Sequence, residues 1–166
     1  MRKIKFVAVI CLCAITLFGC KKDKKVADPE GTIELSMRNN SNGNTQLVFY
    51  LPNGQKLISL HIDDGNNFCY GWGSDSWGVY GDVSLVKVDA NCLGNITTIP
   101  TSGWAKQVAV KPGNAYIAKV ECTSSENDTY KGYTFYCRIY VTSWITSATN
   151  NGIIGAEVKY QYPMPM

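Results

Sequence analysis

The segment Ala115–Val141, AYIAKVECTSSENDTYKGYTFYCRIYV, indicates how the chain folds. It holds two β-rich segments, AYIAKVECT and YTFYCRIYV, on either side of the polar segment SSENDTYKG. Both segments are rich in β-branched and aromatic residues, which is typical of strands. A polar loop between two such strands predicts an antiparallel hairpin.

The other apolar segments are equally short, and turn residues separate them. They are TIELSM (32–37), QLVFYL (46–51), KLISLHI (56–62), DVSLVKV (82–88), KQVAV (106–110) and IIGAEVKYQY (153–162). Clusters of Gly, Asn and Pro lie between them, and PNGQ between Leu51 and Lys56 is the clearest signal for a tight hairpin. This spacing is typical of an all-β sandwich or barrel, and we expect an antiparallel sandwich.

One short stretch indicates a particular kind of sandwich. VKPGNAY, Val110–Tyr116, is similar to the tyrosine corner of immunoglobulin-like and fibronectin type III modules. The resemblance implies that the Tyr116 hydroxyl binds the upstream backbone and that Val110 is buried. A Pro-Gly turn followed by an ordinary strand tyrosine explains the same residues equally well.

The N-terminus has the pattern of an export signal. Arg2, Lys3 and Lys5 precede an apolar run from Phe6 to Phe18. As a helix this run would span about 20 Å, which is too short for a bilayer core of about 30 Å. A basic start, a short apolar centre and a small residue before the cut are the marks of a signal peptide.

The end of that run, LFGC at Leu17–Cys20, resembles the lipobox of bacterial lipoproteins, although Phe18 is bulkier than usual there. The resemblance implies cleavage before Cys20, acylation of that residue with fatty acids such as palmitate, and a lipid anchor in the outer membrane, on its periplasmic side or at the cell surface. We therefore expect a signal peptide (1–19), a lipidated tether (20–31) and a single all-β domain (32–166). An ordinary signal peptide with an incidental cysteine is the alternative.

The charge balance of the predicted domain argues against a nucleic-acid partner. The chain has 16 basic and 13 acidic residues, of which three basic residues leave with the signal peptide. The tether KKDKK (21–25) takes four more basic residues and one acidic residue. Nine basic and twelve acidic residues remain in residues 26–166, a net charge of −3, whereas nucleic-acid binding needs a positive surface.

Four cysteines remain in the predicted domain: Cys69, Cys92, Cys122 and Cys137. An even number in an oxidising compartment predicts two disulfides, which four cysteines can form in three ways. We favour Cys122–Cys137, because the midpoint between them falls in the polar loop of the predicted hairpin, and Cys69–Cys92 follows by exclusion. A zinc site is not expected, because no CxxC pair and no nearby histidine is present.

The sequence predicts no catalytic residue, metal or cofactor. His61 is the single histidine, and strand alternation places it with Ser59 and Leu57, opposite Ile62. A Ser or Cys nucleophile would need it as a base, yet a lone strand histidine is more typical of a solvated or packed residue. DDGNN (63–67) offers oxygen ligands for calcium but lacks the EF-hand register, so a β-turn is favoured.

Candidate ligand-binding residues lie in FCYGWGSDSWGVYGD (68–82). Tyr70, Trp72, Trp77 and Tyr80 stand there among four glycines and a few polar residues. Flat aromatic faces beside polar groups suit sugar stacking. Rings that cap the end of the core are the simpler interpretation. Trp104 and Trp144 are expected to pack in the core.

Longer stretches resemble one family. CLGNITTIPTSGWAKQVAVKPGNAYIA (92–118), YCRIYVTSWI (136–145), NNGIIGAEVKYQYP (150–163) and GTIELSMRNNSNGNT (31–45) resemble an uncharacterised family of secreted lipoproteins of gut bacteroidetes, which carries a domain of unknown function. Cys92 and Ala115 depart from its pattern, where glycine is common. The resemblance implies an exported lipoprotein domain and no particular activity.

These features predict a non-enzymatic, lipid-anchored envelope protein that binds a glycan or a protein. The alternative is a structural or assembly component that pairs through its terminal strand, AEVKYQYPMPM (156–166). A hydrolase is the third and least favoured possibility.

Overall fold

A computed structural model describes residues 26–39, 45–71, 80–124 and 129–164. The strands are β1 (Ile33–Arg38), β2 (Leu47–Tyr50), β3 (Lys56–Ile62), β4 (Asn67–Gly71), β5 (Tyr80–Val88), β6 (Val108–Ala109), β7 (Ala115–Ser124), β8 (Thr134–Thr146) and β9 (Ile153–Gln161). In these ranges the helical structure is a single 3-10 turn, η2 (Leu93–Asn95). No helix there is long and apolar enough to cross a bilayer.

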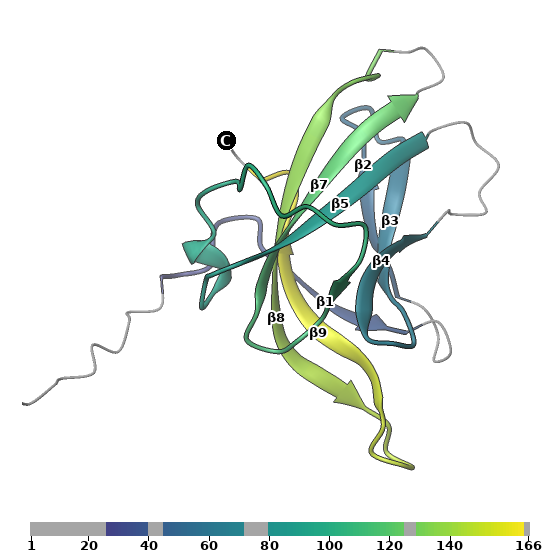
Figure 1. Cartoon of the computed structure of the whole chain (residues 1–166), viewed down its shortest axis with the longest axis vertical. Coiled ribbons are helices and arrows are strands. Elements are labelled where there is room, and N and C mark those ends of the chain that lie inside the picture. The colour runs from purple at the N-terminus through teal and green to yellow at the C-terminus, as the bar shows by residue number, and fades with distance from the viewer. Residues whose placement is uncertain (1–25, 40–44, 72–79, 125–128, 165–166) are drawn as a thin grey trace, which may run out of the picture.

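The strands form the predicted antiparallel sandwich. One sheet has five strands in the order β1-β9-β8-β7-β5, and the other has four in the order β2-β3-β4-β6. All neighbouring strands pair antiparallel, and neither sheet closes into a barrel. Figure 1 shows the long strands β7, β8 and β9 crossing the molecule, with β2, β3 and β4 to one side.

The main core fills the space between the sheets. Its largest fully buried side chains come from both sheets and include Met37, Phe49, Leu60, Ile62, Phe68, Leu85, Tyr116 and Ile139. A second, smaller cluster lies where the segment after β5 folds back over the five-stranded sheet, and it contains Val86, Leu93, Ile96, Ala115, Ile117 and Met164. Trp144 packs against the first cluster and Trp104 against the second, but both rings are only partly buried and lie at the edge of the core rather than within it.

The two predicted turns between β2 and β4 are confirmed. At PNGQ, the amide of Leu51 donates to the carbonyl of Gln55 (2.8 Å), and Gly54 supplies a φ of +84°. At DDGNN, the Asp63 amide donates to the Asn67 carbonyl (2.9 Å), and Asn66 has a φ of +59°. Asn and Gly tolerate these positive φ values, which explains why they occur there.

The hairpin predicted from Ala115–Val141 is formed by β7 and β8, but its register contradicts the expected disulfide. Cys137 lies opposite Ala118, and the amide of Cys122 donates to the carbonyl of Tyr133. The two cysteines are therefore displaced by four residues, about 13 Å along the strands, which is beyond disulfide reach. The prediction of Cys122–Cys137 was wrong, because position in the loop does not fix the register.

The second expected disulfide is not formed either. The Cys69 thiol lies 3.1 Å from the imidazole of His61, and the Cys92 thiol lies 3.6 Å from the carbonyl of Val26. Within the described ranges no disulfide joins any two of the four cysteines.

The tyrosine corner is confirmed. The Tyr116 hydroxyl donates to the Ala109 carbonyl (2.7 Å) and accepts from the Lys111 amide (3.1 Å). Val110 is 3% exposed, and the Tyr116 ring meets Phe68 edge-on at 5.2 Å between centroids. These contacts join the segment before β7 to both sheets. A closer kinship with immunoglobulin-like modules stays a prediction.

Part of the predicted tether belongs to the folded body. The Asp28 carboxylate pairs with the Lys159 ammonium at 2.7 Å, and the Glu30 carbonyl accepts from the Gln161 side chain at 2.5 Å. The carbonyl of Ala27 lies so close to Gly94 that an added Cβ there would be 2.5 Å from it. Packing against β9 and η2 therefore begins before residue 32, where the predicted domain starts.

Candidate functional site

The predicted aromatic stretch is only partly described. Trp72 and Trp77 lie outside the described residues, and Tyr80 is placed only as the first backbone position of β5. Tyr70 shares the inner face of β4 with Phe68 and is half-buried against the core. The ammonium of Lys106 lies 5.8 Å from the centre of its ring. Tyr70, the one side chain of the predicted set that the structure describes, therefore lies at the edge of the core.

A different set of aromatic side chains, the aromatic row, leads from the core to the surface. It consists of Phe49, Tyr162, Phe135, Tyr133 and Tyr130. Successive ring centroids along this order are 5.0, 6.1, 6.5 and 5.7 Å apart. The ring planes of Phe135 and Tyr133 are inclined by 26° to each other, which is a stacked arrangement. The other contacts are tilted or edge-on. Such contacts hold each ring in a fixed orientation.

The row reaches solvent at Tyr133, its fourth ring, while Tyr130 beyond it is partly buried against the core. Tyr133 is 55% exposed, and Tyr50, beside the row, is 50% exposed. The Tyr162 hydroxyl donates to the Tyr50 carbonyl (2.9 Å), and this hydrogen bond connects Tyr50 to the aromatic row. Burial raises the pKa of Tyr162, which keeps its phenol protonated as this donor. The row therefore begins at a buried ring, Phe49, and is open to solvent at Tyr133.

Three separate parts of the chain supply the row and its neighbour. Phe135 is the second residue of β8, and Tyr133 directly precedes the strand, so the two rings, two positions apart, lie on the same side of the chain. Tyr162 follows β9, which pairs with β8, and Tyr50 ends β2 in the other sheet. This surface was not predicted from the sequence, because its residues were assigned to strands and, for Tyr130, to the polar loop between two of them. The aromatic spacing in TYKGYTFY and KYQYP was the available signal.

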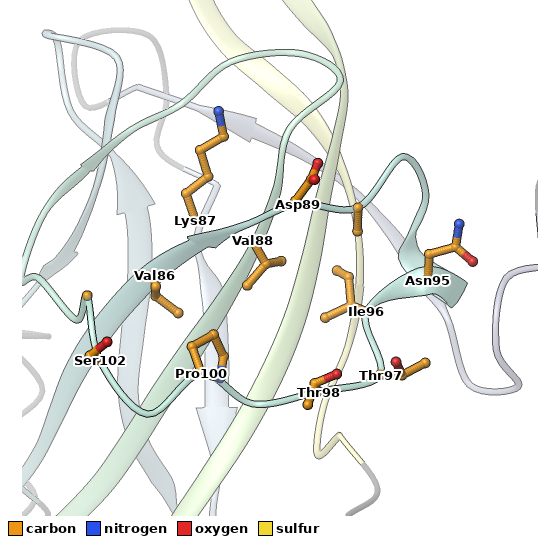
Figure 2. Close-up of a pocket in the computed structure, with 12 residues that line it drawn as sticks. Val86, Lys87, Val88, Asp89, Asn95, Ile96, Thr97, Thr98, Pro100 and Ser102 are labelled. Atoms are coloured by element: carbon orange, nitrogen blue, oxygen red, sulfur yellow. The ribbon is translucent and has the colours of Figure 1, made fainter. Parts of the chain in front are cut away.

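A groove of about 500 Å³ lies at the end of β5 (Figure 2). Its lining residues are Val86, Lys87, Val88, Asp89, Ala90, Asn95, Ile96, Thr97, Thr98, Pro100, Ser102 and Gly103. In Figure 2, Val86 and Val88 project from the strand toward Pro100 and Thr98 on the opposite segment. The lining combines hydroxyl, amide and aliphatic groups with the charged side chains of Lys87 and Asp89 and has no aromatic ring, so it offers hydrogen bonds but no stacking surface.

A buried arginine fastens the segment that forms the far wall of the groove. Arg138 on β8 donates to the Ile96 carbonyl (3.0 Å) and twice to the Gln161 amide oxygen (2.7 and 2.5 Å). Burial lowers the pKa of its guanidinium. Farther along, Ala105 and Leu85 exchange two backbone hydrogen bonds of 2.7 and 2.8 Å. The groove wall is thus attached to the five-stranded sheet at two points.

His61 and Cys69 form a contact that the sequence analysis did not expect. They lie directly opposite each other on β3 and β4, and the sulfur is 3.1 Å from Nε2. Leu60 and Ile62 enter the core while His61 and Ser59 share the other face, as predicted. Leu57 was predicted to share the face of His61 but belongs to the core cluster, because the pairing of β2 with β3 shifts register at this end of the strand. A thiol and an imidazole therefore meet on the outer face of the four-stranded sheet.

The structure gives no metal site in its described part. No group of three or more His, Cys, Asp or Glu side chains is close enough there to hold an ion. At DDGNN, the Asp63 carboxylate instead accepts from the amide of Asn67 (2.8 Å) and the side chain of Gln107 (2.5 Å). These bonds support the turn interpretation of this loop.

Comparison with known proteins adds no functional assignment. No protein-family profile, curated protein or solved structure matches the chain. Its function is therefore inferred from its own residues.

Proposed function

We propose that the chain is a lipid-anchored binding module of the cell envelope that holds a glycan on the aromatic row and Tyr50. The observation that carries this proposal is the continuity of the row from buried Phe49 to Tyr133, more than half of which is exposed. Exposing an aromatic ring to water is normally unfavourable for a folded protein. Rings that neighbouring rings hold in place form a rigid surface, so few side-chain conformations are lost when a ligand binds.

The chemistry of the exposed rings fits a neutral sugar. The faces of sugar rings carry C–H groups, which pack on aromatic faces and remove apolar area from water. The phenol hydroxyls of Tyr133 and Tyr50 accept or donate hydrogen bonds at the sugar's edge, which phenylalanine cannot do. The row contains no charged side chain, so an uncharged glycan meets no unpaired charge within it.

The anchor is proposed from the LFGC junction at Leu17–Cys20. Only five residues separate Cys20 from Val26, where packing against the body begins, and five residues span at most about 18 Å. An acylated Cys20 would therefore hold the domain close to the outer membrane, on its periplasmic side or at the cell surface. Metabolic labelling with palmitate should mark the wild-type protein, and Cys20→Ser should lose both the label and membrane fractionation. Unchanged labelling of that variant would exclude the anchor.

The glycan proposal is tested on a glycan array with the mature protein. We expect a bound glycan whose signal falls about tenfold in Tyr133→Ala and in Tyr50→Ala, because an aromatic anchor is worth at least about 1 kcal/mol. Ile153→Ala is the matched control, since Ile153 is an exposed apolar residue of β9 outside the row. Equal signals from all four proteins would remove the row as the binding site.

The alternative role, assembly through the terminal strand, finds no support in the sheet order. Between Gly155 and Tyr160, β9 pairs with β1 on one side and β8 on the other. No edge of this segment is open to a strand of another chain, so the binding module is the better proposal.

A further inference from the structure

We propose that Cys69 is a nucleophile whose proton passes to His61, and that this pair accepts an activated acyl group, such as an ester or thioester, on the outer face of the four-stranded sheet. This activity is separate from glycan binding, because neither residue belongs to the aromatic row.

The sheet itself sets the geometry of the pair. Directly opposed residues of antiparallel strands hold their Cβ atoms about 5 Å apart, so the contact between Cys69 and His61 does not depend on a mobile loop. The distance of 3.1 Å between sulfur and Nε2 is within reach for proton transfer. His61 is 8% exposed, whereas Cys69 is partly exposed and therefore reachable by a small reagent.

Two polar atoms beside the pair are buried and lack partners. The Nδ1 atom of His61 and the hydroxyl of Ser59 form no hydrogen bond within the described structure. Both side chains are more than nine-tenths buried, and both lie on the same face of β3. Buried polar atoms are nearly always paired, so unpaired ones on the face that carries the thiol–imidazole contact are unusual and point to a functional role for this face.

The protonation states fit general-base assistance. Burial raises the pKa of the Cys69 thiol to about 11, and burial lowers the pKa of His61 below its ordinary value. The Asp63 carboxylate, after β3, interacts with both groups and partly offsets the change at His61. At neutral pH the thiol is protonated and the imidazole is neutral, so Nε2 is free to take the thiol proton as the sulfur attacks.

The proposed step is an acyl transfer in which no group is oxidised or reduced. The sulfur of Cys69 bonds to the acyl carbon, and its proton moves to Nε2 of His61. The bond from the acyl carbon to the departing oxygen or sulfur then breaks, and the same proton passes from Nε2 to the departing alcohol or thiol. The products are an S-acyl cysteine and a free alcohol or thiol.

The experiment treats the folded, mature protein with p-nitrophenyl acetate and locates acetyl groups by peptide mass spectrometry at a series of pH values. We expect acetylation of Cys69, with a rate that rises through the pKa of His61 and then levels off. In His61→Gln the rate at neutral pH should fall about a hundredfold and climb with pH toward the thiol pKa. Cys92, Cys122 and Cys137 are at most 7% exposed and serve as internal controls.

A second variant tests the pair if His61→Gln does not fold. Because the Asp63 charge raises the pKa of His61, Asp63→Asn should move the lower inflection of the rate profile to lower pH. The proposal is overturned if Cys69 of the native protein is not acetylated, if it is isolated in a disulfide, or if the rate profile does not depend on His61 and Asp63.

Discussion

Gly155→Ala is expected to lower the free energy of unfolding by about 4 kcal/mol or more, or to prevent folding. A Cβ at this position would lie 2.1 Å from the carbonyl oxygen of Met37 and 2.8 Å from the Cα of Arg38. Both atoms belong to the backbone of β1, which pairs with β9 at this point, with Arg38 opposite Gly155. Relief of the clash would require β1 to separate from β9, because no flexible side chain can move instead.

Gly113→Ala is the matched control for this prediction. Gly113 has a φ of +79°, and an added Cβ would meet no atom within 4 Å. The control therefore measures the cost of a left-handed backbone alone, about 1–2 kcal/mol. Urea denaturation of both variants gives the comparison, and similar losses would show that β1 and β9 are not in close contact at Gly155.

Tyr116→Ala should cost about 3–5 kcal/mol, because it removes a fully buried ring that meets Phe68 in the core. Tyr116→Phe keeps the ring and removes only the hydroxyl. It should cost about 1–3 kcal/mol, since the Ala109 carbonyl and the Lys111 amide both lose this partner. The difference between the two variants separates the packing of the ring from the hydrogen bonds of the corner.

Tyr133→Phe serves as the control for the loss of a hydroxyl, because Tyr133 is an exposed tyrosine that directly precedes β8. A surface substitution of this kind changes stability by less than about 0.5 kcal/mol. If thermal and urea unfolding give the same loss for Tyr116→Phe and Tyr133→Phe, the corner does not stabilise the fold.

Much of the fold was predictable because it depends on local patterns. Alternation located β3 at Lys56–Ile62 to the residue, and PNGQ located the hairpin before it. The short stretch Val110–Tyr116 predicted a hydrogen-bonded corner, since a Pro-Gly turn and a strand tyrosine are close in sequence. Each of these features needs only a few neighbouring residues to specify it.

Features that depend on pairing between distant segments were missed. β4 (Asn67–Gly71) was assigned partly to a turn and partly to a glycine-rich aromatic stretch, because Asn66 and Asn67 precede Phe68 and glycines recur from Gly71 onward. The register that separates Cys122 from Cys137 follows from the whole β7–β8 ladder rather than from loop length. The contact of His61 with Cys69 arises only once β4 pairs with β3.

The candidate binding surface was missed for the same reason. Tyr50, Tyr133 and Tyr162 come from three segments far apart in the chain, and only the sandwich brings them together. The predicted stretch around Tyr70 had the right residue types in a compact sequence pattern. Its described ring, however, packs against the core. The sequence alone favoured rings that cap the core at this stretch, and only the fold determines which aromatic side chains elsewhere are exposed.

The central claim, glycan binding on the aromatic row, is tested most directly by titrating the strongest array glycan into the mature protein while NMR follows assigned ring and methyl signals. We predict shifts for the rings of Tyr133 and Tyr50, none for buried Tyr116, and a Kd about tenfold weaker in Tyr133→Ala. Shifts confined to the groove methyls of Thr97 and Thr98, with the row unchanged, would contradict the claim.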